Sequence, residues 1–404
     1  MKDMEEIRQK LKDRIMGQLP MDTEVDDDQV RDMIDSALIA EGRSLGLTLE
    51  EKQQLAKELF YTIRRMDILQ EIIENREISE VMINAANIFI ERAGRIVRWD
   101  KSFSSDEKLA DVIQQIVARC NRTVNESSPI VDARLEDGSR VNIVLAPVAL
   151  NGPIVTIRRF PEKPMQMEDL KRFGAITQEV IDFLQQLVVA GYNIFISGGT
   201  GSGKTTFLNA LSNYIPKDER IITIEDSAEL QIQGVPNLVR LETRNANVEG
   251  CKEISMRDLI KASLRMRPDR IVVGEVRGSE ALDMVQAMNT GHDGSLSTGH
   301  ANSAADMLSR LETMILMGMD LPLSAIRGQL ASGIDVIVHL GRLRDKSRKV
   351  LQVVEILDYK DDVIETNVLY EFEEEGEDEQ GRILGSLKKR NPLEHKEKLR
   401  AAGL

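Results

Sequence analysis

The stretch that decides the fold is GGTGSGKTT, residues 198–206, which directly follows the apolar segment NIFIS (193–197) and directly precedes FLNALSNYI (207–215). It matches the pattern G-x-x-x-x-G-K-[ST] completely, in the strand–loop–helix context that this pattern requires. The glycines allow backbone N–H groups to surround phosphate oxygens, and the helix that follows adds the positive end of its dipole. The sequence therefore predicts a phosphate-binding loop made of Gly198, Gly199, Thr200, Gly201, Ser202, Gly203, Lys204, Thr205 and Thr206.

In a loop of this kind, Lys204 is expected to reach the β- and γ-phosphates of a nucleotide and the Thr205 hydroxyl to ligate Mg²⁺. Hydrolysis needs, in addition, a metal anchor and a group that orients the attacking water. Three further segments end predicted strands, and ligands meet an α/β sheet at the carboxyl ends of its strands. From these segments we expect Glu275 to activate water, Glu225 and Asp226 to act with Mg²⁺, and His300 to donate as a neutral imidazole to the γ-phosphate.

Other polar residues have a plainer explanation beside the functional one. Glu229 is equally well explained as a helix cap. A histidine that is merely hydrogen-bonded at a strand end is the simpler interpretation of His300, and His339 in DVIVHL is expected to be a sheet residue. His292 makes a weaker case still, and Cys251 is assigned no role.

The pattern around the loop predicts the domain organisation. From residue 175 to 360, short apolar strands alternate with helices, which indicates a mostly parallel sheet covered on both faces. Residues 78–160 combine strand patterns, a hairpin turn at Asp137–Gly138 and one amphipathic helix, and predict an α+β domain. The intervening stretch 161–174, with two prolines and no periodicity, predicts a linker.

The two ends of the chain differ from the middle. Residues 1–77 predict a helical arm with a capping box at Thr48 and Glu51, loosely packed up to about residue 43. Residues 361–404 predict a charged tail made of a strand-like piece, the acidic run EFEEEGEDE and a basic helical end. Ser104 and Glu107 predict a second capping box, and Cys120 is expected to be a core thiol on the helix that follows.

Composition excludes several classes of protein. Of 404 residues, 42% are hydrophobic and 30% charged, which is typical of a globular protein, and no apolar run approaches the ~20 residues of a membrane span. The N-terminus lacks the features of a secretory signal, so we expect a cytosolic protein. Two cysteines are too few for a disulfide framework. The net charge of −14 and the 4% aromatic content argue against a nucleic-acid surface.

The excess of acidic over basic residues lies at the two ends of the chain. Residues 1–80 hold 12 basic and 20 acidic residues, a balance of −8, and residues 361–404 hold 7 and 12, a balance of −5. Residues 81–360 are therefore nearly neutral, at −1. We interpret the acidic N-terminal arm as a surface that faces a basic partner.

With these motifs in place, the sequence closely resembles the type II/type IV secretion ATPases, and within them the CpaF/TadA branch that powers assembly of Tad (Flp) pili. The resemblance rests on GGTGSGKTT, ITIEDSAEL (222–230), RIVVGEVRG (270–278) and GSLSTGHANS (294–303), with DGSRVNI and TIRRF upstream. It implies a RecA-like ATPase domain, a smaller PAS-like α+β domain and a helical arm, assembled as a ring of six subunits. It also implies ATP and Mg²⁺ as ligands, and pilin insertion or extraction through an inner-membrane platform, at the cytoplasmic face of the membrane.

The resemblance assigns roles residue by residue. Lys204 and Thr205 match the Walker A residues, Glu275 the Walker B glutamate, Glu225 and Asp226 the Asp box and His300 the His box. Further arginines match those that bring positive charge to the phosphates, from the N-terminal domain or near the γ-phosphate: Arg140, Arg158, Arg159, Arg240 and Arg244. The tetracysteine zinc module of the pilus-extension ATPases is absent from this sequence.

Three other functions stay open at this point. One is a type IV secretion traffic ATPase that moves effector proteins or DNA–protein complexes. Another is a nucleic-acid motor of RecA type, whose turnover DNA would stimulate. The last is a nucleotide-gated scaffold that binds ATP without hydrolysing it.

Overall fold

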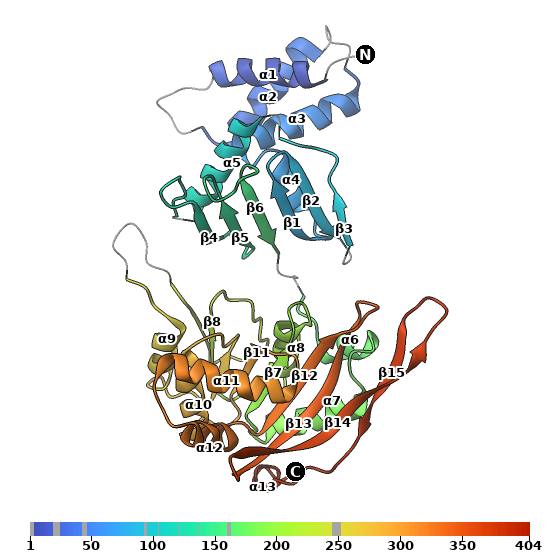
Figure 1. The fold of residues 1–404 in the computed structure, drawn as a ribbon. Coiled ribbons are helices and arrows are strands. Elements are labelled where there is room, and N and C mark those ends of the chain that lie inside the picture. Colours follow the sequence, from blue (N-terminus) through green and yellow to red (C-terminus); the bar gives the residue numbers. More distant parts are fainter. Residues whose placement is uncertain are drawn as a thin grey trace. The chain divides into compact units, whose positions relative to one another are not determined.

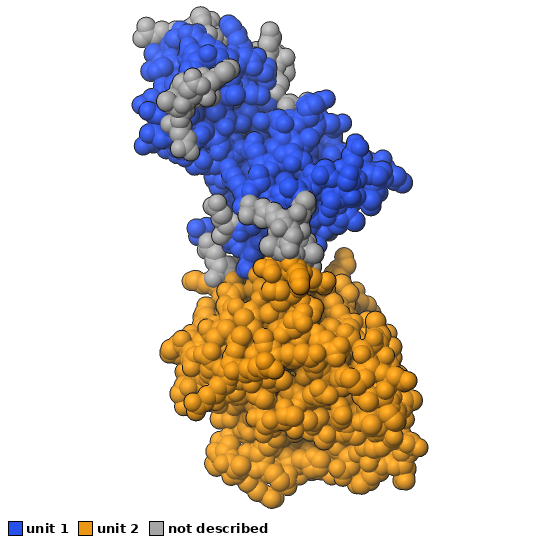
Figure 2. All heavy atoms as spheres, turned by 90° about the vertical axis from the view of Figure 1, so that its left-hand side faces the viewer, with its two compact units in different colours: residues 1–161 blue, residues 162–404 orange. Residues whose placement is uncertain are grey.

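The computed structural model forms two compact units, an N-terminal unit of residues 1–161 and a C-terminal unit of residues 162–404, which are coloured separately in Figure 2. The described residues are 4–18, 25–42, 47–92, 95–103, 105–120, 122–135, 137–159, 163–244 and 252–404.

The N-terminal unit begins with three helices, α1 (Met4–Gln18), α2 (Asp27–Gly42) and α3 (Leu49–Arg64). The predicted capping box at the start of α3 is confirmed, since Thr48 Oγ1 accepts from the Glu51 N–H and Glu51 Oε2 accepts from the Thr48 N–H. The expectation of loose packing is wrong for α1 and α2. Apolar residues at helical spacing on both helices are buried against α3, and the core contains Leu11, Ile15, Val30, Ile34, Leu55 and Leu59.

A six-stranded antiparallel sheet follows, covered by α4 (Ile68–Glu74) and α5 (Asp106–Arg119), which share its core. In spatial order its strands are β3 (Arg95–Arg98), β2 (Asn87–Arg92), β1 (Ile78–Asn84), β6 (Ile154–Arg158), β5 (Arg140–Val144) and β4 (Ile130–Arg134). The predicted hairpin is confirmed as β4–β5, with Gly138 at φ +88°. Cys120 packs half-buried against this core.

The cap of α5 lies one residue later than the sequence suggested. Ser105 is the N-cap residue, and its side chain accepts from the Lys108 N–H. The predicted partner Ser104 lies outside the described residues.

The C-terminal unit is built on a nine-stranded sheet (Figure 1). In spatial order its strands are β15 (Ile383–Lys389), β14 (Val363–Glu377), β13 (Arg348–Lys360), β12 (Val336–Arg342), β7 (Ile194–Gly198), β11 (Leu296–His300), β10 (Arg270–Val273), β8 (Ile221–Glu225) and β9 (Leu238–Glu242). The strands from β12 to β9 run parallel, whereas β13, β14 and β15 are antiparallel additions.

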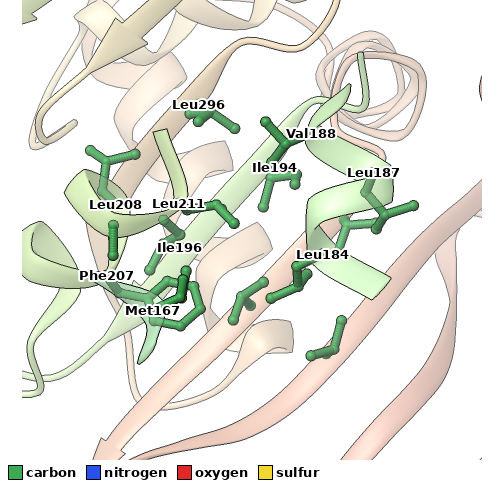
Figure 3. Close-up of a cluster of buried hydrophobic side chains, with 14 of the residues drawn as sticks. Met167, Leu184, Leu187, Val188, Ile194, Ile196, Phe207, Leu208, Leu211 and Leu296 are labelled. Carbon is green, nitrogen blue, oxygen red and sulfur yellow. The ribbon is translucent and has the colours of Figure 1, made fainter. Parts of the chain in front are cut away.

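Helices cover both faces of this sheet, as the sequence predicted. Ile194 and Ile196 point from β7 into a core shared with α7 (Gln178–Val189) and α8 (Lys204–Ser212), which Figure 3 shows in close-up. Phe195, between them, belongs to the opposite core. That core also takes in α9 (Met256–Ser263), α10 (Glu280–Asn289), α11 (Ala304–Gly318) and α12 (Leu323–Gly333).

The predicted linker is wrong for residues 167–174. Residues Met167–Arg172 form helix α6, where the Gln166 N–H donates to Asp169 Oδ2 at 3.1 Å. Met167 is 1% exposed in the core of the C-terminal unit, and Lys349 Nζ donates to the Gly174 carbonyl. Burial of this one apolar residue, which no periodic pattern announces, fixes the segment to the sheet.

The strand-like piece predicted in the charged tail is confirmed as the start of β14, but the acidic run is not a solvated tail, because it continues β14 and pairs with β15. The acidic run on β14 is neutralised in place by arginines, with Arg344 pairing to Glu374 and Glu377, and Arg390 to Glu373. The chain end is then held against the sheet: buried Glu355 accepts from the backbone N–H groups of residues 394 and 395. The last helix is α13 (Glu397–Ala401).

Among the described residues, no helix is both long enough and apolar enough to cross a bilayer.

Candidate functional site

The predicted phosphate-binding loop lies between β7 and α8, at the carboxyl edge of the parallel strands. Gly201 and Gly203 adopt φ values of +72° and +93°, in the left-handed region that favours glycine. A Cβ at Gly198 would lie 2.5 Å from the Leu340 carbonyl oxygen and 2.6 Å from Ser202 Oγ. The three glycines are thus required by backbone geometry.

Two side chains of the loop are suited to an anionic ligand. Lys204 Nζ curls back and donates to the Gly199 carbonyl at 3.2 Å, so the ammonium lies over the loop. Burial lowers the pKa of Lys204, and the nearby Glu275 carboxylate opposes that shift. Ser202 Oγ is buried and has no hydrogen-bond partner among the described residues. A buried cation above a cradle with an unused hydroxyl fits the phosphates of a nucleotide.

Two of the predicted residues, His300 and Glu275, lie at or just beyond strand ends and form a contact chain with Lys204. His300 closes β11, which pairs with β7 so that His300 lies opposite Gly198. Its Nδ1 is 3.2 Å from Lys204 Nζ, and its Nε2 is 2.7 Å from Oε1 of Glu275, just beyond β10. Since the lysine ammonium can only donate, Nδ1 accepts and the proton of the neutral ring sits on Nε2. Burial lowers the pKa of His300, which favours this neutral form.

The sequence interpretation missed Arg277, which the structure places at the same carboxylate. Its NH2 group donates to Glu275 Oε2 at 2.6 Å, and its NH1 group lies 3.6 Å from Asp226 Oδ2. The signal was available in RIVVGEVRG, where an arginine follows the glutamate by two residues.

Glu225 and Asp226 point in different directions although they are consecutive. Glu225 is 2% exposed, and its Oε1 accepts from the backbone N–H groups of Glu229 and Leu230, whereas Oε2 is buried without a hydrogen-bond partner among the described residues. Burial raises the pKa of Glu225 to about 7, against the effect of those two N–H groups. Asp226 is more exposed and accepts from Thr243 Oγ1 at 2.8 Å.

The positions of these carboxylates decide which of the predicted residues can ligate Mg²⁺. The described residues contain no cluster of three or more His, Cys, Asp or Glu side chains placed to hold a metal. Mg²⁺ commonly takes only one or two protein ligands and fills its octahedron with waters and phosphate oxygens. The unused Oε2 of Glu225 and the Thr205 hydroxyl, on the first turn of α8, are donors of this kind. The helix-cap interpretation of Glu229 is wrong, since no helix begins in residues 226–244.

We expect Glu225→Gln to change how stability depends on pH. Because the folded pKa, about 7, lies above the ordinary value of 4.5, the folded protein binds the extra proton and is destabilised as pH rises from about 4.5 to about 7. The glutamine cannot ionise, so at pH 8 the variant should be more stable than the wild type by about 2–3 kcal/mol. At pH 4.5 the two should be equal.

The measurement is thermal unfolding of both proteins between pH 4.5 and 8 in buffer without metal or nucleotide. Glu365→Gln on the exposed side of β14 is the control, and should follow the wild type at every pH. A constant difference between Glu225→Gln and the wild type across this range would contradict the expectation.

The predicted arginines fall into two groups. Arg240 lies on β9, and its charge opposes the raised pKa of Glu225; Arg244 donates to the Lys252 carbonyl. The other three belong to the N-terminal unit. There Arg140 and Arg158 are direct neighbours across β5 and β6, whereas Arg159 donates to the Asn75 carbonyl at 2.6 Å.

The remaining histidines lie away from this cluster. His339 is buried in β12, as predicted, with its Nδ1 at 2.8 Å from Ser197 Oγ. The Nδ1 of His292 lies 3.3 Å from the Ala287 carbonyl, at the end of α10. Cys251 lies outside the described residues.

A cavity of about 400 Å³ opens on the other side of the loop, within the C-terminal unit. Its walls combine loop residues with apolar side chains of the α6 segment and with the β12–β13 turn. Arg348, which the sequence interpretation also missed, donates from β13 to the Gly201 carbonyl at 2.9 Å and so braces the loop. The lining includes Met165, Leu170, Phe173, Phe207 and Leu340, with Ser202, Gly203 and Thr206 of the loop.

Comparisons with known proteins agree with this geometry. The chain is 33% identical over 293 residues to a putative conjugal transfer protein of Mycobacterium tuberculosis, covering 71% of this chain and 83% of that protein. It is 32% identical to the conjugal transfer protein TrbB of Rhizobium radiobacter, over 75% and 91% of the two chains. The solved structure of the Legionella pneumophila ATPase DotB shares the fold, with a TM-score of 0.51 at 20% identity, over 73% of this chain and 80% of that one.

The fold is therefore that of the RecA-like secretion ATPases, as the resemblance implied. The family model described as "Type II/IV secretion system protein" matches residues 64–383, from the end of α3 into β15. A match over this length covers the phosphate-binding loop and all the strand ends that carry the cluster. The chain belongs to the type II/IV secretion system protein family.

Proposed function

We propose that the protein is a Mg²⁺-dependent ATPase whose hydrolysis of ATP drives a secretion or pilus-assembly machine at a membrane. The observation that carries this proposal is the contact chain from Lys204 through His300 to Glu275. It joins the phosphate-binding loop to a carboxylate at the end of a parallel strand. An ion pair with a purely structural role would explain any one of these contacts. It would not explain why a buried ammonium, a neutral imidazole and a carboxylate contact one another in this order above a phosphate cradle.

The roles of the residues follow from their positions. The loop N–H groups and Lys204 bind the phosphates, and the cavity beside the loop accommodates the nucleoside against its apolar wall. Thr205 and Glu225 would hold Mg²⁺, and the chemistry it would supply is neutralisation of charge on the β- and γ-phosphates. Glu275 orients water for attack on the terminal phosphate and takes its proton, while His300 fixes the orientation of the Glu275 carboxylate.

Arginines complete the proposal. Arg140 and Arg158 lie directly opposite one another on adjacent strands, and placing two like charges in this way is unfavourable. Asp132 lies 3.5 Å from Arg140 and offsets part of this repulsion, so a further anion would relieve the rest. We infer that these two approach the phosphates when the subunits assemble, in a ring of six. Arg159 is a weaker choice because the Asn75 and Ile78 carbonyls already engage it. Arg240 and Arg244 contribute charge near the Glu225 end of the site.

The machine that the ATPase serves has two candidates. Two features favour assembly of a Tad (Flp) pilus through an inner-membrane platform. They are the sequences of the four motif blocks and the helical bundle that precedes the residues matched by the family model. The relatives named as conjugal transfer proteins, one of which is covered over 91% of its length, favour a type IV secretion role instead. On either assignment the protein works in the cytoplasm, peripherally at the membrane.

Phosphate release from the full-length protein with Mg²⁺ and ATP tests the ATPase proposal directly. We expect turnover that requires Mg²⁺ and is unchanged by added DNA. Turnover that rises several-fold with DNA would favour a nucleic-acid motor, and bound ATP without released phosphate would favour a nucleotide-gated scaffold. Loss of surface pili or loss of DNA transfer after deletion of the gene separates the two machines.

A further inference from the structure

Arg277 combines a fixed backbone with a side chain held only by ion pairs. The Val276 N–H donates to the Thr298 carbonyl, and the N–H groups of Arg277 and Gly278 both donate to Glu280 Oε1. The guanidinium is 59% exposed and contacts the carboxylates of Glu275 and Asp226. The Cα position is therefore set by the sheet and by the start of α10, while the side chain can exchange one anionic partner for another.

The two oxygens of Glu275 differ in their surroundings. Oε1 is buried, lies 2.7 Å from His300 Nε2 and accepts no hydrogen bond within the described residues, whereas Oε2 accepts from Arg277 NH2. A carboxylate that accepts a proton from water needs an accessible oxygen directed at that water, so Oε2 must be released from Arg277. His300 is held from its other side by Lys204, whereas the Arg277 guanidinium is 59% exposed, so water screens its pair with Glu275 and competes for it.

The position of the guanidinium also favours Arg277, and not His300, as the side chain that leaves Glu275. Burial is the main reason that the pKa values of Lys204 and His300 are lowered, and the positive charge of Arg277 adds to both shifts. The Arg277 guanidinium therefore lies within electrostatic range of the loop lysine, on the same side of Glu275 as the predicted attacking water. Guanidinium–phosphate bonds are charge-assisted and can be bidentate, which makes them stronger than the exposed pair they replace.

We propose that Arg277 exchanges partners on ATP binding, leaving Glu275 Oε2 for the terminal phosphate and so directing the carboxylate at water when ATP, rather than ADP, is bound. This inference rests on the proposed ATPase function. It makes Arg277 the residue through which the site distinguishes a triphosphate from a diphosphate.

The test is Arg277→Met, measured in the full-length protein by ATP and ADP affinity, by the separate values of kcat and KM, and by thermal unfolding. We expect the Kd for ATP, measured in the Glu275→Gln background to prevent turnover, to rise about tenfold, as loss of one charge-assisted contact implies. The Kd for ADP should stay within about twofold, kcat should fall at least tenfold, and the melting temperature should not change. Arg277→Lys should recover part of the ATP affinity.

The matched control is Arg382→Met, because Arg382 is equally exposed and paired with Asp378 at the β14–β15 turn. It should leave every measurement unchanged. Equal weakening of ATP and ADP, or no change in either, would overturn the proposal, as would faster turnover at unchanged ATP affinity. If the wild-type protein released no phosphate, the proposed ATPase function itself would be wrong. If the wild type turned over ATP normally and Arg277→Met did the same, only the proposed role of Arg277 would be wrong.

Discussion

Glu275→Gln is expected to lower ATP turnover at least 100-fold while leaving ATP affinity within about threefold of the wild type. Glutamine has nearly the same shape and can still accept from Arg277, so the cluster should keep its geometry. It cannot take a proton from water, and that step is the one assigned to Glu275. The measurement pairs steady-state phosphate release with equilibrium ATP binding on the same preparation.

The control for this variant is Glu365→Gln, which makes the same chemical change on an exposed residue of β14. It should turn over ATP at the wild-type rate. Retained turnover in Glu275→Gln would remove Glu275 from the mechanism, whereas loss of ATP affinity in that variant would show that the carboxylate acts in binding.

Lys204→Ala is expected to weaken the binding of both ATP and ADP at least 100-fold and to abolish hydrolysis at ordinary nucleotide concentrations. Lys204 Nζ is the buried cation that lies over the loop, between the Gly199 carbonyl and His300 Nδ1. Because burial disfavours its charge, the alanine variant should be no less stable than the wild type. Loss of binding would then reflect the missing ammonium and not unfolding.

Fluorescent-nucleotide titration and thermal unfolding together check this expectation. Lys360→Ala, which removes an exposed lysine paired with Asp358, should bind nucleotide normally. Unchanged affinity in Lys204→Ala would exclude the loop as the phosphate site. The contrast with Arg277→Met is diagnostic, since only the lysine variant should lose ADP as well as ATP.

The sequence predicted the centre of the C-terminal unit because its signals are local. A phosphate-binding loop needs glycines at fixed spacing, and the positive φ values of Gly201 and Gly203 show why no other residue type serves there. Buried parallel strands are short and mostly apolar, so β7, β8 and β10 could be recognised in the sequence. The polar residue that ends each strand then marked the functional edge of the sheet.

Packing between distant segments had no such signal. The acidic run at residues 371–379 looks like a solvated tail because its charges outnumber its apolar residues. Pairing of β14 with β13 and β15 nevertheless makes most of it part of the sheet and places arginines beside it. Likewise α6 is fixed by burial of Met167, and the first helices by burial against α3. The charge and composition of a segment indicate which environments its side chains tolerate. The residues that neutralise or bury those side chains come from elsewhere in the chain, so the segment's own sequence does not identify them.

The sequence alone therefore determined that this protein binds a nucleotide phosphate on a parallel α/β sheet, and named Lys204, Glu275 and His300. Only the tertiary structure decided that these three lie in one contact chain, that Glu225 is a buried carboxyl with its pKa raised to about 7, and that Arg277 holds the second oxygen of Glu275. The physical reason is that spacing along a chain fixes backbone conformation, whereas distances between strand ends depend on sheet order, with β11 between β7 and β10.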